Sequence, residues 1–372
     1  MKFTISKHAL TSALYKAVGV ADRKSAQNIL SHVLVESIDP GHVRVTATDF
    51  DVVVIGVYPA EVIEPGRMAI NAKNAHEVAR TLTDAPITLT GLSNHWVDVA
   101  CGSSHFKLAG LPPDDFPENV KPDGANAFKV PKRLLLGLFD RTAFSVSHDE
   151  TRPSLMGVLL RMTREEGEVR LVAASTDGHR LSKAEALGGD AGTFKGPADC
   201  IVTGKAISDI KRALEGDADD VEVSMFRENL VLTCDGVTLQ VRKLDEQFPD
   251  YSKVIPKPKN TWRVSRVALV SAIKRVAVLT SAKTSIIRFE TGAERLLLTA
   301  QNPEMGEGRD EVPVDGSDAS CAVGFNYKYV LDVLGIIAGD TINLSVNDQY
   351  SPGLITSDDD AGSMFVVMPM RV

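Results

Sequence analysis

The stretch Val169-Arg170-Leu171-Val172-Ala173-Ala174-Ser175-Thr176-Asp177 is a strand-length run of mostly apolar residues that ends in a polar turn. Two other stretches have the same form: residues 43–49, which end at Asp49, and residues 296–302, which end at Asn302. Asp49 lies 128 positions before Asp177, and Asn302 lies 125 positions after it. Because near-constant spacing between similar segments is the signature of repeated units, the chain is predicted to hold three copies of one fold.

In each copy, the same secondary-structure elements flank this strand in the same order. An amphipathic helix and a second apolar strand are expected before it, and another helix and a β-hairpin after it. The helical spacing is clearest at Leu10, Ala13, Leu14 and Ala17. The hairpin is clearest at residues 230–241, where Asp235-Gly236 supplies the turn. The preceding strands are predicted at residues 29–35, 155–160 and 285–289.

These elements predict an α+β fold class, with three repeated domains of two helices packed on antiparallel sheet. The expected boundaries are residues 1–120, 128–253 and 260–372, with polar, Pro-containing stretches between them. A chance likeness of three α+β domains is the alternative. The common order of six helices and their strands favours the repeat.

The composition excludes several classes of protein. The 372 residues are 44% hydrophobic and 24% charged, values typical of globular domains and not of disordered chains. The four cysteines are far apart and form no C-x-x-C pair, which disfavours a zinc site or a disulfide framework. No apolar run is long enough to span a bilayer, and no secretory signal is recognisable at the N-terminus. We therefore expect a cytoplasmic protein without membrane partners.

The charge is distributed unevenly between the helices and the rest of the chain. The whole chain carries −8, which by itself argues against binding nucleic acid by bulk attraction. The predicted helices, however, hold only four acidic residues and fourteen basic ones, a net of +10, which leaves −18 elsewhere. The basic residues are Lys7, Lys16, Lys73, Arg80, Lys132, Arg133, Arg141, Lys205, Lys211, Arg212, Arg266, Lys274, Arg275 and Lys328.

Such segregation predicts one basic helical face and one acidic face. Lys and Arg are good helix formers, which is the simpler explanation, but Glu is an equally good one and is nearly absent from these helices. A basic face of this kind would contact DNA phosphates without reading the base sequence.

The segment Thr176-Asp177-Gly178-His179-Arg180-Leu181 is the strongest candidate for catalysis. His179 between an acid and a base could move protons, so a hydrolase or transferase that uses Asp177, His179 and Arg180 remains the alternative function. No serine or cysteine nucleophile motif accompanies it, and Gly178 indicates a tight turn that exposes His179 and Arg180. The histidines and cysteines lack metal-ligand spacing, so neither a metal nor a cofactor is expected. The apolar end at residues 365–372 is either a core strand or a surface for partner peptides.

Several motifs together resemble one known family. They are Met1-Lys2-Phe3-Thr4, Ala47-Thr48-Asp49, Asp149-Glu150-Thr151-Arg152-Pro153, Thr176-Asp177-Gly178-His179-Arg180-Leu181, Phe248-Pro249-Asp250-Tyr251 and Val367-Met368-Pro369-Met370-Arg371. In this order and spacing, which cover the chain from end to end, they resemble bacterial DNA polymerase III subunit beta, the beta sliding clamp.

This resemblance implies three DNA-clamp domains that form a ring as a head-to-tail homodimer around duplex DNA. It implies a DNA sliding clamp, a processivity factor that is not an enzyme but a non-catalytic subunit of a DNA polymerase holoenzyme. The implied partners are sequence-independent duplex DNA, the replicative polymerase catalytic subunit, the clamp loader, and translesion polymerases and repair proteins that bind through linear motifs. A monomeric scaffold stays open as a further alternative.

The resemblance also implies three sets of site residues. The hydrophobic pocket for partner peptides would be lined by Leu155, Thr176, Gly178, His179, Arg180, Leu181, Pro249, Val254, Val366, Met368, Pro369 and Met370. The candidates for DNA contact, which combine the implied positions with the basic helices, are Lys24, Lys73, Asp149, Pro153, Ser154, Lys132, Arg133, Lys205, Lys211, Arg212, Lys274 and Arg275. The apolar pair at the ring interface would be Phe106 of one subunit and Val278 with Leu279 of the other. The loop at residues 148–154 lacks the aromatic residues that can occur there in the family, so its contact with DNA is an open question.

Overall fold

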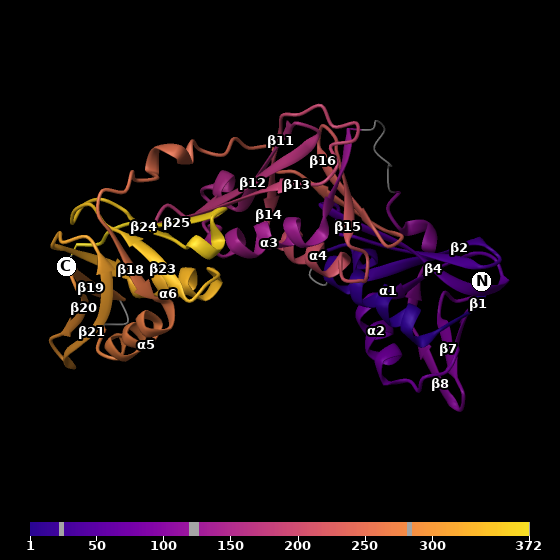
Figure 1. Ribbon diagram of the computed structural model, residues 1–372. Coiled ribbons are helices and arrows are strands. Elements are labelled where there is room, and N and C mark those ends of the chain that lie inside the picture. Colours follow the sequence, from indigo (N-terminus) through magenta and orange to yellow (C-terminus); the bar gives the residue numbers. More distant parts are fainter. Residues whose placement is uncertain (22–25, 119–125, 281–284, 372) are drawn as a thin grey trace. The chain divides into compact units, whose positions relative to one another are not determined.

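A computed structural model describes residues 1–21, 26–118, 126–280 and 285–371. The chain divides into two compact units, and Figure 1 labels their helices and strands. The first unit holds Met1–Arg133, Arg164–Val169 and Gly188–Lys243; the second holds Leu134–Thr163, Arg170–Leu187 and Leu244–Val372. The boundary therefore passes through the central repeat.

The first unit is built on one continuous antiparallel sheet. Strand β4 is long enough to pair with β17 of the central repeat near its start and with β1 near its end. The path runs β10-β15-β16-β17-β4-β1-β6-β7-β8, and β3 and β2 extend it beside β4. The strands of this sheet are β1 Lys2–Ile5, β2 His32–Asp39, β3 His42–Thr48, β4 Val52–Glu64, β5 Arg67–Asn71, β6 Ile87–Gly91, β7 Val97–Cys101, β8 Ser104–Leu108, β9 Gly110–Leu111, β10 Ala127–Pro131, β15 Asp220–Met225, β16 Asn229–Cys234 and β17 Val237–Arg242. Strand β14, Ala198–Thr203, also belongs to this unit but not to this sheet.

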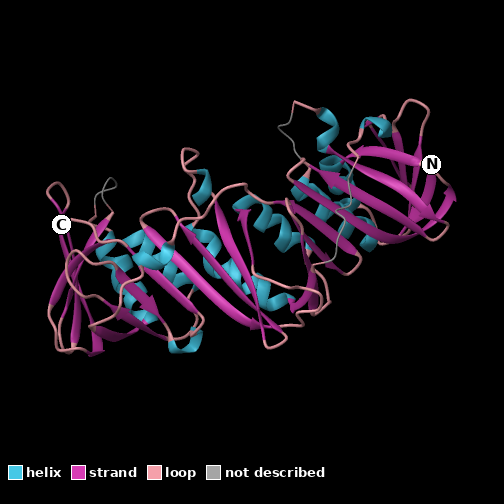
Figure 2. Ribbon diagram, turned by 90° about the horizontal axis from the view of Figure 1, so that it is seen from above, coloured by secondary structure: helices cyan, strands magenta, loops and turns pink. Residues whose placement is uncertain are grey.

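Three helices pack on this sheet: α1 Lys7–Val20, α2 Ala72–Thr81 and α4 Gly204–Ala213. Each begins at a polar cap; Ser6 Oγ, for example, accepts the backbone N–H of Ala9 at 3.2 Å, and such a cap contributes about 1 kcal/mol. The apolar stripe predicted for α1 is buried against β3 and β4, as expected. Figure 2 shows the helices in cyan packed against the magenta strands.

The second unit has a comparable sheet in the order β11-β12-β13-β25-β24-β23-β18-β21-β20-β19-β22. Strand β13 pairs antiparallel with β25, and this pair joins the central repeat to the last one. The strands are β11 Gly157–Glu165, β12 Glu168–Thr176, β13 Arg180–Gly188, β18 Thr261–Ser265, β19 Ile286–Thr291, β20 Arg295–Asn302, β21 Gly306–Gly316, β22 Cys321–Asn326, β23 Thr341–Ser345, β24 Gly353–Thr356 and β25 Ser363–Val367, and the helices are α3 Lys132–Thr142, α5 Arg266–Ala277 and α6 Tyr327–Ile336. The first two residues of α3, the end of β11 and start of β12 at Arg164–Val169, and the last residue of β13, Gly188, belong to the first unit.

Most predicted elements are present where the sequence placed them. All six helices form, and the hairpin at residues 230–241 turns at Asp235 and Gly236, whose φ angles of 50° and 71° fit an Asp-Gly turn. Two of the preceding strands were predicted to begin too early. Short 3-10 helices occupy Asn28–Ser31 and Pro153–Leu155, because these apolar side chains are buried by a turn and not by strand pairing.

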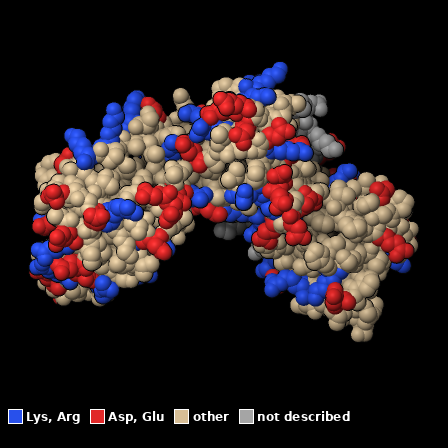
Figure 3. All heavy atoms as spheres, in the orientation of Figure 1, with Lys and Arg blue, Asp and Glu red and all other residues tan. Residues whose placement is uncertain are grey.

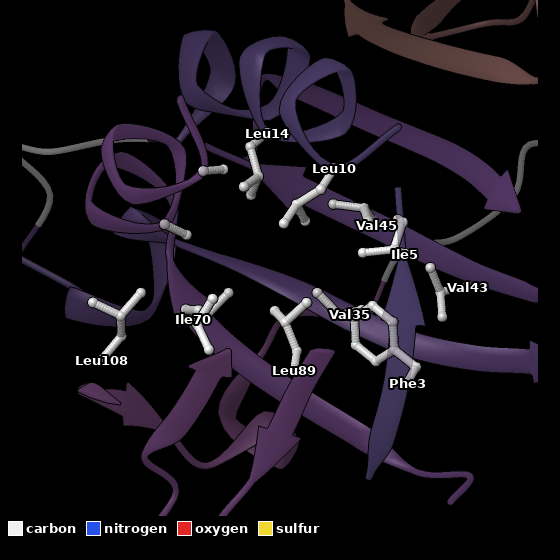
Figure 4. A pocket seen from close by; sticks show the side chains of 13 residues that line it. Phe3, Ile5, Leu10, Leu14, Val35, Val43, Val45, Ile70, Leu89 and Leu108 are labelled. Carbon is white, nitrogen blue, oxygen red and sulfur yellow. The ribbon is translucent and has the colours of Figure 1, made fainter. Parts of the chain in front are cut away.

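The core of the first repeat is closely packed. Its internal cavity, shown in Figure 4, has a volume of about 10 Å³ and is lined by apolar side chains, Phe3, Leu10 and Leu89 among them. That volume is about the smallest that holds one water molecule, so this cavity has no room for a substrate. In the described part of the chain, no helix is long and apolar enough to cross a membrane.

Candidate functional site

The predicted turn at Thr176–Leu181 is held by its own side chains. Asp177 Oδ1 accepts the backbone N–H groups of His179 at 2.9 Å and Arg180 at 3.0 Å, and Thr176 Oγ1 accepts that of Gly178 at 3.1 Å. Gly178 has φ 89°, a value that L-residues rarely adopt, so this turn requires glycine. His179 is exposed, as predicted, but the Arg180 side chain is only 12% exposed, so its expected exposure was wrong.

Arg180 is fixed from several sides. Its guanidinium donates to the Phe144 carbonyl at 2.7 Å, to Asp177 at 3.1 Å and to Asp332 of α6. It also lies against two aromatic rings, 4.6 Å from the centroid of Tyr329 and 5.2 Å from that of Phe144. An arginine with its donors engaged in this way ties β13 to α6 and is poorly placed for proton transfer.

The end of the chain lies next to this turn. In the β13–β25 register Arg180 pairs with Val367 and Leu181 with Val366. Beyond β25, the N–H of Met368 donates to the His179 carbonyl at 2.8 Å, and the N–H of Met370 donates to the Gly324 carbonyl at 2.8 Å. The structure thus brings together two predicted groups that are far apart in sequence, and both methionine side chains stay about one-third exposed.

A small apolar cluster adjoins this turn. Leu181, Leu354 and Val366 are buried side by side, and the partly buried Tyr251, Ile255 and Met364 pack against them. We call the turn Thr176–Leu181, the residues Val366–Met370 and this cluster the tail surface. The prediction missed Leu354, which is the cross-strand partner of Val366, and missed Phe144, Tyr329 and Asp332, which hold Arg180. No sequence pattern marks these residues, because pairing between distant strands brings them in.

The remaining candidates for the partner-peptide pocket are less clearly part of the tail surface. Leu155 is buried, and its carbonyl accepts the N–H of Ser147 at 2.9 Å. Val254 is 43% exposed at the end of a 3-10 helix, Tyr251–Val254, that adjoins the cluster through Tyr251. Pro249 is exposed, and Pro369 lies between the two anchored methionines.

Several candidate DNA-contact side chains already have protein partners. Lys205 pairs with Asp49, Arg275 with Asp310 at 2.6 Å, and the Lys132 ammonium donates to the Gly216 carbonyl at 2.6 Å. Arg212 lies over the Tyr15 ring with its guanidinium carbon 5.5 Å from the centroid. Lys73, Arg133 and Lys274 are exposed, whereas Lys24 lies outside the described residues. In Figure 3 a group of Lys and Arg side chains lies near α2, and Asp and Glu side chains lie on the same face of the molecule.

The helix charge count overstates the positive charge that is open to DNA. Lys16 is buried, and this burial lowers the pKa of its ammonium. Arg266 caps the end of α6 by donating to the carbonyls of Leu334 at 3.1 Å and Gly339 at 2.7 Å, and Arg141 pairs with the buried Asp360 at 3.0 Å. These three side chains are buried or bonded within the fold, so the net of +10 is an upper limit for the basic face.

The loop that carries Asp149, Pro153 and Ser154 is stabilised from within. Asp149 accepts hydrogen bonds from the Thr151 side chain and backbone and from Arg152, which together lower the pKa of its carboxyl group. Arg152 is therefore engaged with Asp149 at 2.8 Å. Across the described residues, no group of three or more His, Cys, Asp or Glu side chains could hold a metal ion.

Of the candidate interface residues, Phe106 and Val278 are exposed apolar side chains and Leu279 is half-buried. Phe106 is 37% exposed on β8, the last strand of the sheet path in its unit. Val278 is 68% exposed just after α5, and Leu279 follows it. An edge strand offers unpaired backbone groups, so another strand can join the sheet there.

A buried carboxylate between α1 and α4 gives a testable pH effect. Asp209 is 4% exposed, its Oδ2 has no hydrogen-bond partner, and its Oδ1 is 3.8 Å from Arg212. Burial raises the pKa of Asp209, although Lys205 and Arg212 oppose this rise. Between the ordinary pKa of 3.8 and the raised pKa of the folded state, the folded protein holds a proton that the unfolded chain has released. The free energy of unfolding therefore falls as the pH rises through this range.

Replacing Asp209 by Asn is therefore expected to raise the melting temperature at pH 7. The gain should shrink as the pH falls towards the ordinary pKa of 3.8 and be least below it, where the wild-type carboxyl group is neutral in both states. Thermal unfolding at several pH values measures this effect, with Asp217→Asn as the exposed control. A gain that does not depend on pH would contradict this account.

The fold and this site define a class of protein. Three repeats of two helices on antiparallel sheet, joined through shared sheet edges and with predominantly basic helices, are the architecture of a DNA clamp. Models of the N-terminal, central and C-terminal domains of the DNA polymerase III beta subunit match residues 1–121, 129–250 and 252–371 in that order. The chain belongs to this family, the beta sliding clamps, which are non-catalytic processivity factors, so the catalytic alternative is not supported.

Known relatives agree over the whole length. The chain is 33% identical to the beta sliding clamp of Chlamydia muridarum, covering 100% of this chain and 99% of that one. It is 31% identical to that of Caulobacter vibrioides, covering 100% of both. Among solved structures, the sliding clamp of Pseudomonas aeruginosa bound to griselimycin is similar with a TM-score of 0.92 and 30% identity, covering 100% of both chains.

Proposed function

We propose that this chain is a DNA sliding clamp that closes into a ring of two copies around duplex DNA and tethers the replicative polymerase to it. The observation that carries the proposal is the match of all three clamp domains, in order, along one chain. The ring would be linked to the DNA by topology. Weak phosphate contacts therefore suffice, and the clamp remains free to slide.

The ring interface is proposed to form between Phe106 of one copy and Val278 with Leu279 of the other. Phe106 and Val278 are exposed in the single chain and Leu279 is half-buried, and their burial on association would stabilise the dimer. Two copies arranged head to tail would use the same pair of surfaces twice and close the ring.

The DNA is proposed to contact the exposed cations of the helices. Lys73, Arg133 and Lys274 are the best placed of these, because they are exposed. Lys132, Lys205, Lys211, Arg212 and Arg275 would add to the positive field while they keep their protein partners. Asp149, Pro153 and Ser154 remain candidates through the shape of their loop.

The tail surface is proposed to receive linear motifs of partner proteins. Two exposed methionines whose backbone is anchored on both sides give an adaptable apolar surface on a rigid base. Leu155, Pro249, Val254 and Pro369 would complete it. The proposed partners are the polymerase catalytic subunit, the clamp loader, and translesion polymerases and repair proteins, all in the cytoplasm and without a cofactor.

Retention on DNA tests this proposal. Protein loaded by its cognate clamp loader should stay on circular DNA and should leave rapidly once the DNA is cut by a restriction enzyme, because the ring slides off the new ends. Gel filtration of the two mixtures measures the bound fraction. Equal dissociation from circular and linear DNA would refute topological linkage and would favour a monomeric scaffold.

A further inference from the structure

Each of the six helices in the described part of the chain has a basic residue at its first or second position, and none of them has Asp or Glu in its first turn. The N-terminus of a helix carries partial positive charge, so acidic side chains stabilise it and basic ones destabilise it. Helix stability therefore does not explain this pattern. The six residues are Lys7, Lys132 and Arg266 in the first helix of each repeat, and Lys73, Lys205 and Lys328 in the second.

The basic residues of the three first helices are bound within the fold. Each of them donates a hydrogen bond to a backbone carbonyl near the C-terminal end of the second helix of its own repeat. Helix ends leave such carbonyls without an intrahelical partner, and their partial negative charge attracts a cation. The fold therefore accounts for this set, which we call the linking cations. The pairs are Lys7 with Leu82, Lys132 with Gly216 at 2.6 Å, and Arg266 with Leu334 at 3.1 Å and Gly339 at 2.7 Å.

The basic residues of the three second helices occupy one equivalent position. Lys73, Lys205 and Lys328 are each the second residue of their helix, and each is exposed. In every case a side chain just before the helix, Asn or Thr, accepts a backbone N–H of the first turn. The ammonium groups of Lys73 and Lys328 have no hydrogen-bond or ion-pair partner in the described part of the chain, whereas Lys205 pairs with Asp49. The fold leaves two of these three charges free.

Pairing with a nearby acid does not explain these lysines either. An acidic residue follows each of them four positions later, but none of the three pairs lies within ion-pair distance in the described structure. The acids also differ in environment. Glu77 is exposed, Asp209 is buried, and Asp332 is bound by Arg180. What the three helices share is therefore the exposed lysine and not an ion pair.

We propose that Lys328 contacts a DNA phosphate, as the equivalent in the last repeat of Lys73 and Lys205, and that the linking cations do not. This inference rests on the proposed function, which places DNA against the exposed cations of the helices. A phosphate beside Lys328 would meet a mobile ammonium group and the positive end of α6 together. Such a contact positions DNA without reading its sequence, as a sliding protein requires. Charge counting alone did not separate Lys328 from Arg266, because both are basic residues at the start of a helix.

The test measures binding of the full-length protein to a short labelled duplex by fluorescence anisotropy, at a series of sodium chloride concentrations. The logarithm of the affinity falls linearly with the logarithm of the salt concentration, with a slope of about 0.9 for each phosphate contact. Lys328→Gln is expected to reduce this slope by about one and to weaken binding about fivefold to tenfold at about 0.1 M salt. The loss should be equal for two duplexes of different sequence. Lys73→Gln should have the same effect.

Two variants in the same unit as Lys328 serve as controls. Lys257→Gln removes an exposed lysine that lies before β18 and outside the helices, so the salt slope should not change. Arg266→Gln removes a linking cation; it should lower the melting temperature and leave the slope unchanged, because this guanidinium is already bound. Lys328→Gln should not lower the melting temperature, because it removes a charge that the helix dipole opposes.

A wild-type slope for Lys328→Gln, or equal losses for Lys328→Gln and Lys257→Gln, would overturn the inference. If Lys73→Gln reduces the slope and Lys328→Gln does not, this inference fails and the proposed function stands. If the wild-type protein shows no salt-dependent binding, the proposed function itself fails. A Lys328→Gln protein that loses affinity for a motif peptide and not for DNA would assign this lysine to partner binding, which also overturns the inference.

Discussion

Replacing Val278 and Leu279 together by Asp is expected to convert the protein from a particle of twice 40.1 kDa into a monomer of 40.1 kDa. Each copy would bring two carboxylates into an apolar contact with Phe106 of its partner. A buried charge without a partner costs several kcal/mol, and a ring of two copies contains this contact twice. Light scattering coupled to gel filtration measures the mass.

The same variant should lose its retention on circular DNA entirely, because an open chain cannot be linked to a circle. Val267→Asp is the matched control. Val267 is 58% exposed on α5, close in sequence to the proposed contact but outside it, so this variant should remain dimeric. A dimeric Val278→Asp, Leu279→Asp protein would refute the assignment of the interface.

The sequence predicted the repeated elements well because each is specified locally. The apolar stripe of α1 and the Asp235-Gly236 turn each depend on residues that are close in sequence. Both are present in the structure. Two strands were predicted to start earlier in the sequence than they do, and this error shows the limit of the approach. Ile29, Leu30 and Leu155 are apolar and buried, but a periodic pattern cannot distinguish a buried 3-10 turn from a strand.

The sequence could not predict which charges are free. Lys16, Arg141 and Arg266 satisfy the same compositional criterion as Lys73 and Lys274, yet the first three are buried or bonded within the fold. Their partners are distant in sequence: Asp360 lies 219 residues after Arg141, and the carbonyls of Leu334 and Gly339 lie 68 and 73 residues after Arg266. Arg180 is the clearest case, because the motif indicated an exposed functional side chain and the structure places it in a network with Asp177, Asp332 and Phe144.

The positions of these fixed charges affect how the tail surface is expected to work. Arg180 holds the turn against α6, and the turn holds Met368 through the His179 carbonyl. A partner motif would therefore bind to a preorganised backbone that carries adaptable methionine side chains. This arrangement lowers the conformational entropy that the tail surface itself loses when a motif docks.

Replacing Met368 and Met370 together by Asp is expected to weaken binding of the polymerase catalytic subunit's motif peptide by more than about a hundredfold, since each lost apolar anchor costs about 2 kcal/mol. Both side chains are about one-third exposed, so the variant should fold normally. Fluorescence anisotropy of the labelled peptide measures the affinity.

Met305→Asp is the matched control, because Met305 is 55% exposed in the same unit and makes no part of the tail surface. The double variant should still form dimers and stay on circular DNA, because the tail surface shares no residue with the proposed interface. Unchanged peptide affinity would place the docking site elsewhere, and loss of dimerisation would mean that the tail supports the fold and not the partner.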